Sequence, residues 1–114
     1  MVDLSAATGI GEYAFALCGD LKSVVLGEGI TTLPQYAFAA CEKLESINLS
    51  HITAIGEYCF KTDLALPAVD LSAATDIGKY AFVENSALTT VKLNPEGSVI
   101  GEGAFAYSKE LSVV

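Results

Sequence analysis

Apolar residues return along this chain with a period of 22 or 23 residues. The five phenylalanines mark the period most clearly, and each one closes a segment of the general form Ile-Gly-x-Tyr-Ala-Phe. These segments cover residues 10–15, 33–38, 55–60, 77–82 and 100–105. Between them lie runs of the form Leu-x-x-Val-x-Leu at residues 21–26, 44–49, 66–71 and 88–93, with Ile replacing Val in the second run. A period of this length predicts a repeat architecture.

Each repeat is predicted to contain a short strand, a turn, and a helix-like turn that carries Tyr and Phe. About 22 residues cannot enclose a core, but stacked repeats can, because equivalent side chains then pack on one another. Parallel strands of adjacent repeats lie about 4.8 Å apart, so equivalent residues form columns. We expect the phenylalanines to form the main core column. Four tyrosines should form an outer column, which Gly103 interrupts and Tyr107 continues from one turn later. They are Tyr13, Tyr36, Tyr58 and Tyr80.

A polar or small residue stands three positions after each Phe. These residues are Cys18, Cys41, Asp63, Asn85 and Ser108. The combined pattern resembles the leucine-rich repeats of BspA-like surface proteins from bacteria and protists, over the whole chain. The resemblance implies a leucine-rich repeat solenoid of about five repeats. Its parallel β-sheet would line the concave face, with short helical or 3-10 turns on the convex side. A parallel β-helix, with more strand and less helix per turn, is the alternative, and the Tyr-Ala-Phe-Ala segments favour the first fold.

The length of 114 residues predicts a single domain, residues 1–114. Residues 2–15 and 69–82 are identical at 12 of 14 positions, and they are separated by three repeats. This match indicates duplication of a three-repeat block, so we expect the chain to be an excerpt of a longer array.

The glycine of the Ile-Gly motif fits either a positive φ or a close approach between backbones. It is present as Gly11, Gly56, Gly78 and Gly101, but Pro34 takes its place in the second repeat. Because proline cannot adopt a positive φ, close packing is the favoured explanation.

Composition and charge exclude several classes of partner. The net charge is −8, with six Lys and no Arg. Nucleic acids and anionic membrane surfaces are bound through basic residues, so neither is expected as a partner. The first residues lack the basic and apolar segments of a signal peptide. The extracellular or cell-surface location that the family resemblance implies therefore requires that the chain is a mature piece or an excerpt.

Ionisable side chains do not form a recognisable catalytic pattern. Asp3 and Asp70 share a predicted column, but three strand spacings separate them by about 14 Å, beyond the roughly 5–9.5 Å of glycosidase carboxylate pairs. His51 is the only histidine and is interpreted as a turn residue. We therefore expect no enzyme activity and no catalytic residues.

The three cysteines are predicted to be structural. Cys59 takes a position that is Ala in the other repeats, which indicates a small core residue. Cys18 and Cys41 fall on adjacent turns, and we expect both to be free and buried, with a disulfide between them as the alternative. Zinc needs a fourth ligand and a C-x₂₋₄-C spacing, so neither a metal nor a cofactor site is expected.

Residues that flank the central Val or Ile of each strand should point to the concave face, where leucine-rich repeat proteins usually bind. The predicted protein-binding residues are Ser23, Val25, Ser46, Asn48, Asp70, Thr90 and Lys92. The family resemblance implies a non-enzymatic adhesion module for a host or matrix protein. The alternative is a structural spacer or a scaffold that self-assembles into homo-oligomers through uncapped end repeats, because solenoids need polar caps.

Overall fold

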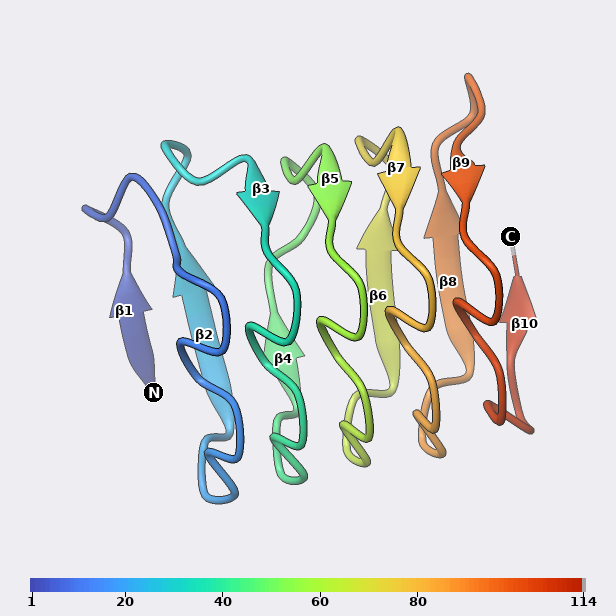
Figure 1. Cartoon of the computed structure of the whole chain (residues 1–114), viewed down its shortest axis with the longest axis horizontal. Helices are drawn as coiled ribbons and strands as arrows, with labels where there is room; N and C mark the ends of the chain where they lie inside the picture. The colour runs from blue at the N-terminus through green and yellow to red at the C-terminus, as the bar shows by residue number, and fades with distance from the viewer. Residues whose placement is uncertain (114) are drawn as a thin grey trace.

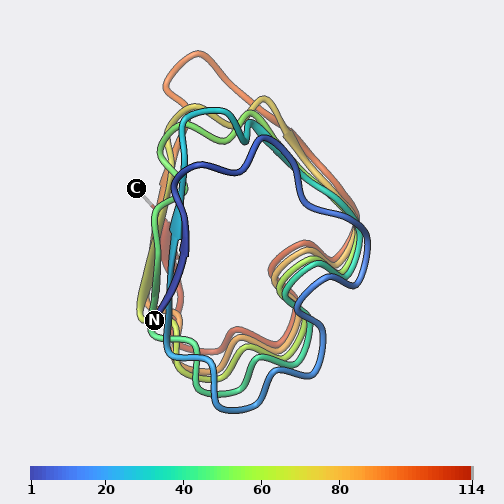
Figure 2. The same cartoon turned by 90° about the vertical axis from the view of Figure 1, so that its left-hand side faces the viewer.

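The computed structural model describes residues 1–113 as a parallel β-solenoid whose turns stack side by side (Figure 1). Viewed along the stack, successive turns superimpose closely, and the chain outlines a flattened ring with one inward fold (Figure 2). Three segments of each turn bond to the next turn. We call them the long-strand face, the short-strand face and the Tyr-Phe segment. The predicted solenoid of stacked parallel strands is therefore confirmed.

The long-strand face is formed by the Leu-x-x-Val-x-Leu runs. Its strands are β1 (Val2–Leu4), β2 (Ser23–Leu26), β4 (Ser46–Ile47), β6 (Ala68–Leu71), β8 (Thr90–Leu93) and β10 (Ser112–Val113). All pairs are parallel and match equivalent residues, for example Val24 with Ile47 and Val69 with Val91. The repeat pattern continues to Val114, which lies outside the described residues.

The short-strand face follows after a turn and precedes each Ile-Gly motif. It contains β3 (Thr32–Leu33), β5 (Ala54–Ile55), β7 (Asp76–Ile77) and β9 (Val99–Ile100), joined as one parallel sheet. The registers pair Leu33 with Ile55, Ile55 with Ile77, and Ile77 with Ile100. Each turn from the second to the fifth thus contributes one strand to each of two faces, whereas the first turn contributes β1 alone.

Two prolines explain where the sheets are interrupted. The long-strand face divides into two three-stranded sheets, β1-β2-β4 and β10-β8-β6, with no pairing between β4 and β6. At other boundaries the first strand bond runs from Glu45 N to Lys22 O and from Thr89 N to Pro67 O. The equivalent bond between β4 and β6 needs an N–H at Pro67, which proline lacks.

Pro34 likewise lacks the N–H that Gly56, Gly78 and Gly101 donate to the preceding turn, and the short-strand sheet begins at β3.

The Tyr-Phe segments are not helical, and the prediction of helical or 3-10 turns on the convex side is wrong. Residues 1–113 contain no helix. The tyrosines have φ near +60°, from 57° at Tyr58 to 60° at Tyr13, as do the residues two positions after each Phe, such as Leu17 at 64° and Ala40 at 59°. In this conformation alternate N–H groups point toward the next turn, whereas those between them, such as Ala37 and Ala39, bond to carbonyls three residues earlier. A right-handed helix would use all of these N–H groups internally. Three bonds per turn result, as from Tyr36, Phe38 and Ala40 to the carbonyls of residues 57, 59 and 61.

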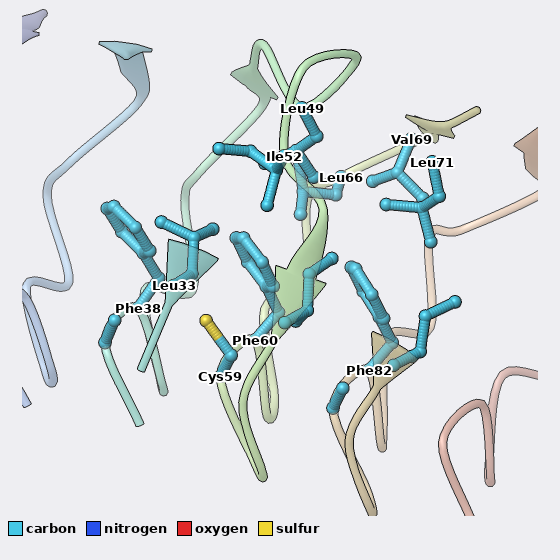
Figure 3. Close-up of a cluster of buried hydrophobic side chains, with 14 of the residues drawn as sticks. Leu33, Phe38, Leu49, Ile52, Cys59, Phe60, Leu66, Val69, Leu71 and Phe82 are labelled. Carbon is cyan, nitrogen blue, oxygen red and sulfur yellow. The ribbon is translucent and has the colours of Figure 1, made fainter. Parts of the chain in front are cut away.

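The core column of phenylalanines is confirmed. Rings of adjacent turns are stacked with centroids 4.9–5.5 Å apart and nearly parallel planes. Phe38, Phe60 and Phe82 are fully buried, and Leu and Ile columns from the two strand faces surround them (Figure 3). Cys59 lies in the same core with no exposed surface, as predicted for a small residue. The core is therefore a set of aligned columns, each made of nearly one residue type.

Glycines of the Ile-Gly motif serve a close approach between backbones, as predicted. A Cβ on Gly56 would lie 2.6 Å from the Gln35 backbone nitrogen, and Gly78 and Gly101 have the same restriction. None of these three has a positive φ. The first of the two positive-φ positions in each turn is the Tyr two residues later, and Gly103 takes that position in the last complete turn with φ 64°.

Candidate functional site

The residues predicted to bind a protein all belong to the long-strand face. Ser46, Thr90 and Lys92 are exposed, while Ser23 and Asp70 are half-buried. Val25 is 40% exposed, which is unusual for a valine in the middle of a strand. The register places Asp70 directly beside Lys92 and Ala68 beside Thr90. The side chains therefore form columns on one face, although the gap between β4 and β6 divides them into two groups.

The side-chain amide of Asn48 is hydrogen-bonded to the backbone of the preceding turn. Its Oδ1 accepts a hydrogen bond from the Leu26 N–H at 2.7 Å, and its Nδ2 donates to the Leu26 carbonyl at 2.8 Å. The side-chain amide thereby takes the place of a backbone partner just where the pairing of β2 and β4 ends. Each polar atom of the amide therefore has one bond within the fold, which fixes the orientation of the exposed Asn48 side chain on this face.

Asp70 is also engaged within the fold. Its Oδ1 accepts a hydrogen bond from the Ser72 N–H at 3.0 Å, and Asp3 does the same with Ser5 at 2.9 Å. Hydrogen bonding to the ionised form lowers the pKa of both carboxyls, and the charge of Lys92 adds a smaller effect at Asp70. Both groups are thus carboxylates that close a turn after a strand, which is a structural role.

A shallow hollow opens beside the interruption in the long-strand face. Its volume is about 390 Å³, and it is lined by Val24, Val25, Ser46, Ile47 and Asn48. Three of these five are predicted binding residues. Ile47 is only half-buried, although the equivalent Val24, Val69 and Val91 are at most 4% exposed. The hollow therefore combines accessible apolar surface with the hydroxyl of Ser46.

A second depression runs along the Tyr-Phe segments, and the sequence analysis did not predict it. It encloses about 230 Å³ between the tyrosine column and the residues two positions after each Phe. The lining residues are Tyr13, Ala16, Leu17, Tyr36, Ala39, Ala40, Lys61 and Thr62. The left-handed residues lie where the chain folds inward (Figure 2).

The predicted tyrosine column is present on the outer surface. Tyr13, Tyr36, Tyr58 and Tyr80 are stacked in order with ring centroids 4.7–5.3 Å apart. A Cβ at Gly103 would overlap the ring of Tyr80, so a side chain at this position would require that ring to shift. Tyr107 is 74% exposed and does not replace the missing ring in the column. Because the rings cover one another's faces, mainly their edges and hydroxyls are available to a ligand.

Groups associated with catalysis or metal binding do not gather in the described part of the chain. No three side chains of His, Cys, Asp or Glu within residues 1–113 are arranged to hold a metal ion. His51 is a turn residue whose Nε2 lies 2.9 Å from the Gly27 carbonyl oxygen. The cysteines are free thiols, and burial raises the pKa of Cys41 to about 12 and that of Cys59 further still. Such thiols remain protonated and unreactive at neutral pH.

Repeated strands, aligned columns and a recurring Leu and Phe pattern define this chain as a leucine-rich repeat β-solenoid. The model of the BspA type leucine-rich repeat region matches residues 5–114 in six copies. The chain belongs to this family. No described helix among residues 1–113 has the length and apolar character needed to cross a membrane.

Two solved structures of bacterial leucine-rich repeat proteins have the same fold. One is the T. pallidum leucine-rich repeat protein, with 28% identity and a TM-score of 0.88 over 93% of this chain and 51% of that protein. The other is from Bacteroides ovatus, with 25% identity and a TM-score of 0.89 over 99% of this chain and 31% of that protein. This chain therefore spans about half or less of each relative. No curated protein matches it.

Proposed function

We propose that this chain is a non-enzymatic module that binds a protein through its long-strand face. The hollow at β2 and β4 is the observation that supports this proposal, because it joins Val25, Ser46 and Ile47 into one accessible apolar and polar surface. Contacts of this kind exclude water around a small number of anchoring side chains on the partner. The absence of Arg and Trp in this chain suggests that the partner supplies those anchors.

The family further suggests a cell-surface protein whose partner is a host or matrix protein. A net charge of −8 favours partners with a basic surface, since opposite charges accelerate encounter. Lys92 is the only cation of the predicted set and lies apart from the hollow, across the interruption between β4 and β6. We therefore assign the anchoring contacts to the β2 and β4 side of the interruption.

Binding of immobilised chain to a panel of purified extracellular-matrix proteins tests the proposal by surface plasmon resonance. Val25→Lys and Ser46→Lys place a charge and added bulk in the hollow, and each should weaken any positive interaction at least tenfold. Thr32→Lys is the matched control, because Thr32 is exposed in a strand of the other face. Equal loss with all three variants, or no loss with the first two, would exclude the hollow as the binding site. Asn48→Ala is unsuitable, because it removes two hydrogen bonds of the fold.

Self-association of the solenoid is the second candidate function. Ile100 of β9 is 46% exposed, whereas the equivalent Leu33, Ile55 and Ile77 are 2% exposed, and the adjacent Val99 is 70% exposed. Apolar side chains and unpaired strand groups on one edge favour pairing with another strand. Light scattering over a micromolar concentration range tests this function, and Ile100→Lys should abolish any species larger than a monomer. A strict monomer throughout would rule it out.

A further inference from the structure

The column of residues three positions after each Phe faces inward, and most of its members donate a hydrogen bond to the preceding turn. The acceptor is always the carbonyl oxygen of that turn's Phe. Cys41 Sγ donates to Phe15 O at 3.1 Å, Asn85 Nδ2 to Phe60 O at 2.8 Å, and Ser108 Oγ to Phe82 O at 3.4 Å. A donor at this position thus recurs in three of the four turns that follow another turn.

Asp63 occupies the same column without an evident donor. Its side chain has no exposed surface, and its Oδ1 accepts a hydrogen bond from the Cys41 N–H at 2.8 Å. Its Oδ2 is buried and has no partner. A buried carboxylate normally has a cation or several donors beside it, since desolvating a charge is costly. A single N–H donor compensates for little of the cost of burying a full negative charge.

Other ionisable groups near Asp63 do not supply a positive charge. The thiols of Cys41 on the preceding turn and Cys59 on the same turn interact with it electrostatically, and both are neutral and buried. The equivalent residue of the following turn is Asn85, whose side-chain amide is uncharged. The nearest lysine in sequence, Lys61, places its Nζ 5.7 Å from the ring centroid of the half-buried Tyr58. Apart from the Cys41 N–H, none of these groups stabilises the ionised form of Asp63.

We propose that Asp63 is a neutral carboxylic acid in the folded protein and that its protonated Oδ2 donates a hydrogen bond to the Phe38 carbonyl. Phe38 stands in the same relation to Asp63 as Phe60 does to Asn85, 25 residues earlier in the chain. The proton completes the pattern of the column, and it makes the contact between the second and third turns sensitive to pH. Loss of the proton would set a buried carboxylate oxygen against a carbonyl oxygen.

Burial supports this assignment, since it raises the pKa of Asp63 from 3.8 to about 9, with the Cys41 N–H acting in the opposite direction. In the unfolded chain the group titrates near its ordinary pKa of 3.8. The folded protein therefore binds one proton more than the unfolded chain between about pH 4 and 9. The contribution of this group to stability is full below the unfolded pKa, falls as pH rises through this window, and levels off above the folded pKa.

The test compares the pH dependence of urea unfolding in the native chain and in Asp63→Asn. Between about pH 5 and 8 the native unfolding constant should rise about tenfold per pH unit relative to the variant. The introduced amide supplies an N–H donor, as Asn85 does, and carries no proton that titrates. Asp76→Asn is the matched control, because Asp76 is exposed in β7 and its replacement should retain the native slope. Parallel curves for the native chain and Asp63→Asn would overturn the proposal.

An infrared measurement tests the proposal even if the variant does not fold. A protonated carboxylic acid has a carbonyl band separate from those of carboxylates, and the folded native chain should show this band at neutral pH. The band should disappear when the protein is unfolded in urea at the same pH. Absence of the band from the folded chain at neutral pH would refute a neutral Asp63.

Discussion

Substitution of Gly56 tests whether the glycine of the Ile-Gly motif is needed for close packing or for a special backbone angle. It lies where β5 leaves the short-strand face, and its N–H donates to Leu33 O at 2.7 Å. A Cβ there would be 2.6 Å from both the Gln35 nitrogen and the Pro34 carbonyl carbon. These atoms are backbone, so they move only if the two turns separate. Gly56→Ala should therefore strain every bond between these turns near this position.

The expected loss of stability is the balance of two costs and one gain. Overpacking costs about 1–3 kcal/mol, and weakening one hydrogen bond between turns costs about 0.5–1.5 kcal/mol more. Alanine restricts the unfolded chain and returns about 0.4–1 kcal/mol. The central values leave a net loss of about 2 kcal/mol in the free energy of unfolding. Urea denaturation followed by circular dichroism measures this quantity.

Gly11 provides a control with the same local sequence. Residues 10–13 and 55–58 both read Ile-Gly-Glu-Tyr, but a Cβ on Gly11 would have no atom within 4 Å. Gly11→Ala should leave stability unchanged or raise it by up to about 1 kcal/mol. Equal effects of the two substitutions would show that an intrinsic backbone preference, rather than the close approach of turns, determines this glycine.

Three further substitutions test other columns. Phe60→Ala should cost about 3–5 kcal/mol and abolish cooperative melting, because the ring is fully buried between two others; an unchanged melting temperature would contradict its role in the core. Tyr58→Asn tolerates the left-handed φ but removes two ring stacks, so urea unfolding should show a loss of about 1–3 kcal/mol, and no loss would mean that the stacks contribute nothing. Pro67→Ala restores an N–H opposite Glu45, and hydrogen exchange by NMR should find the new amide protected; rapid exchange there would disprove the account of the interruption between β4 and β6.

Much of the fold could be predicted because the repeat fixes which residues share a column. The phenylalanine core, the stacked tyrosines, Cys59 in the core and the close approach at Gly56 all follow from the spacing alone. The columns are long-range contacts, yet each one is visible as a local repetition in the sequence. Few other architectures allow this, because contacts between distant segments usually leave no such mark.

The prediction of helical turns fails because Tyr-Ala-Phe-Ala has the composition of a helix. Alternate N–H groups of the segment bond to the next turn instead, and a single repeat gives no sign of these bonds. One signal is present in the sequence: Gly103 replaces a Tyr in its column, which suggests a positive φ for the whole column. The inward fold and the depression along it follow from that angle, so a helical interpretation misses both.

Part of the candidate site could not be predicted because the backbone already uses the polar side chains. Asn48 and Asp70 look available on a strand face, but both bond to main-chain groups. Pro67 could have been recognised as a missing donor, since its position in the strand is explicit in the sequence. The interruption beside the hollow follows from that one residue.

The two interruptions in the sheets lie at different boundaries between turns. Pro34 leaves the first boundary without the short-strand sheet, while β1 and β2 remain paired there. Pro67 leaves a later boundary without the long-strand sheet, while β5 and β7 remain paired. The Tyr-Phe bonds cross both boundaries. Within residues 1–113, each of these two boundaries therefore keeps the hydrogen bonds of at least one sheet. Stepwise unfolding under a pulling force should show no block of repeats that detaches at either proline.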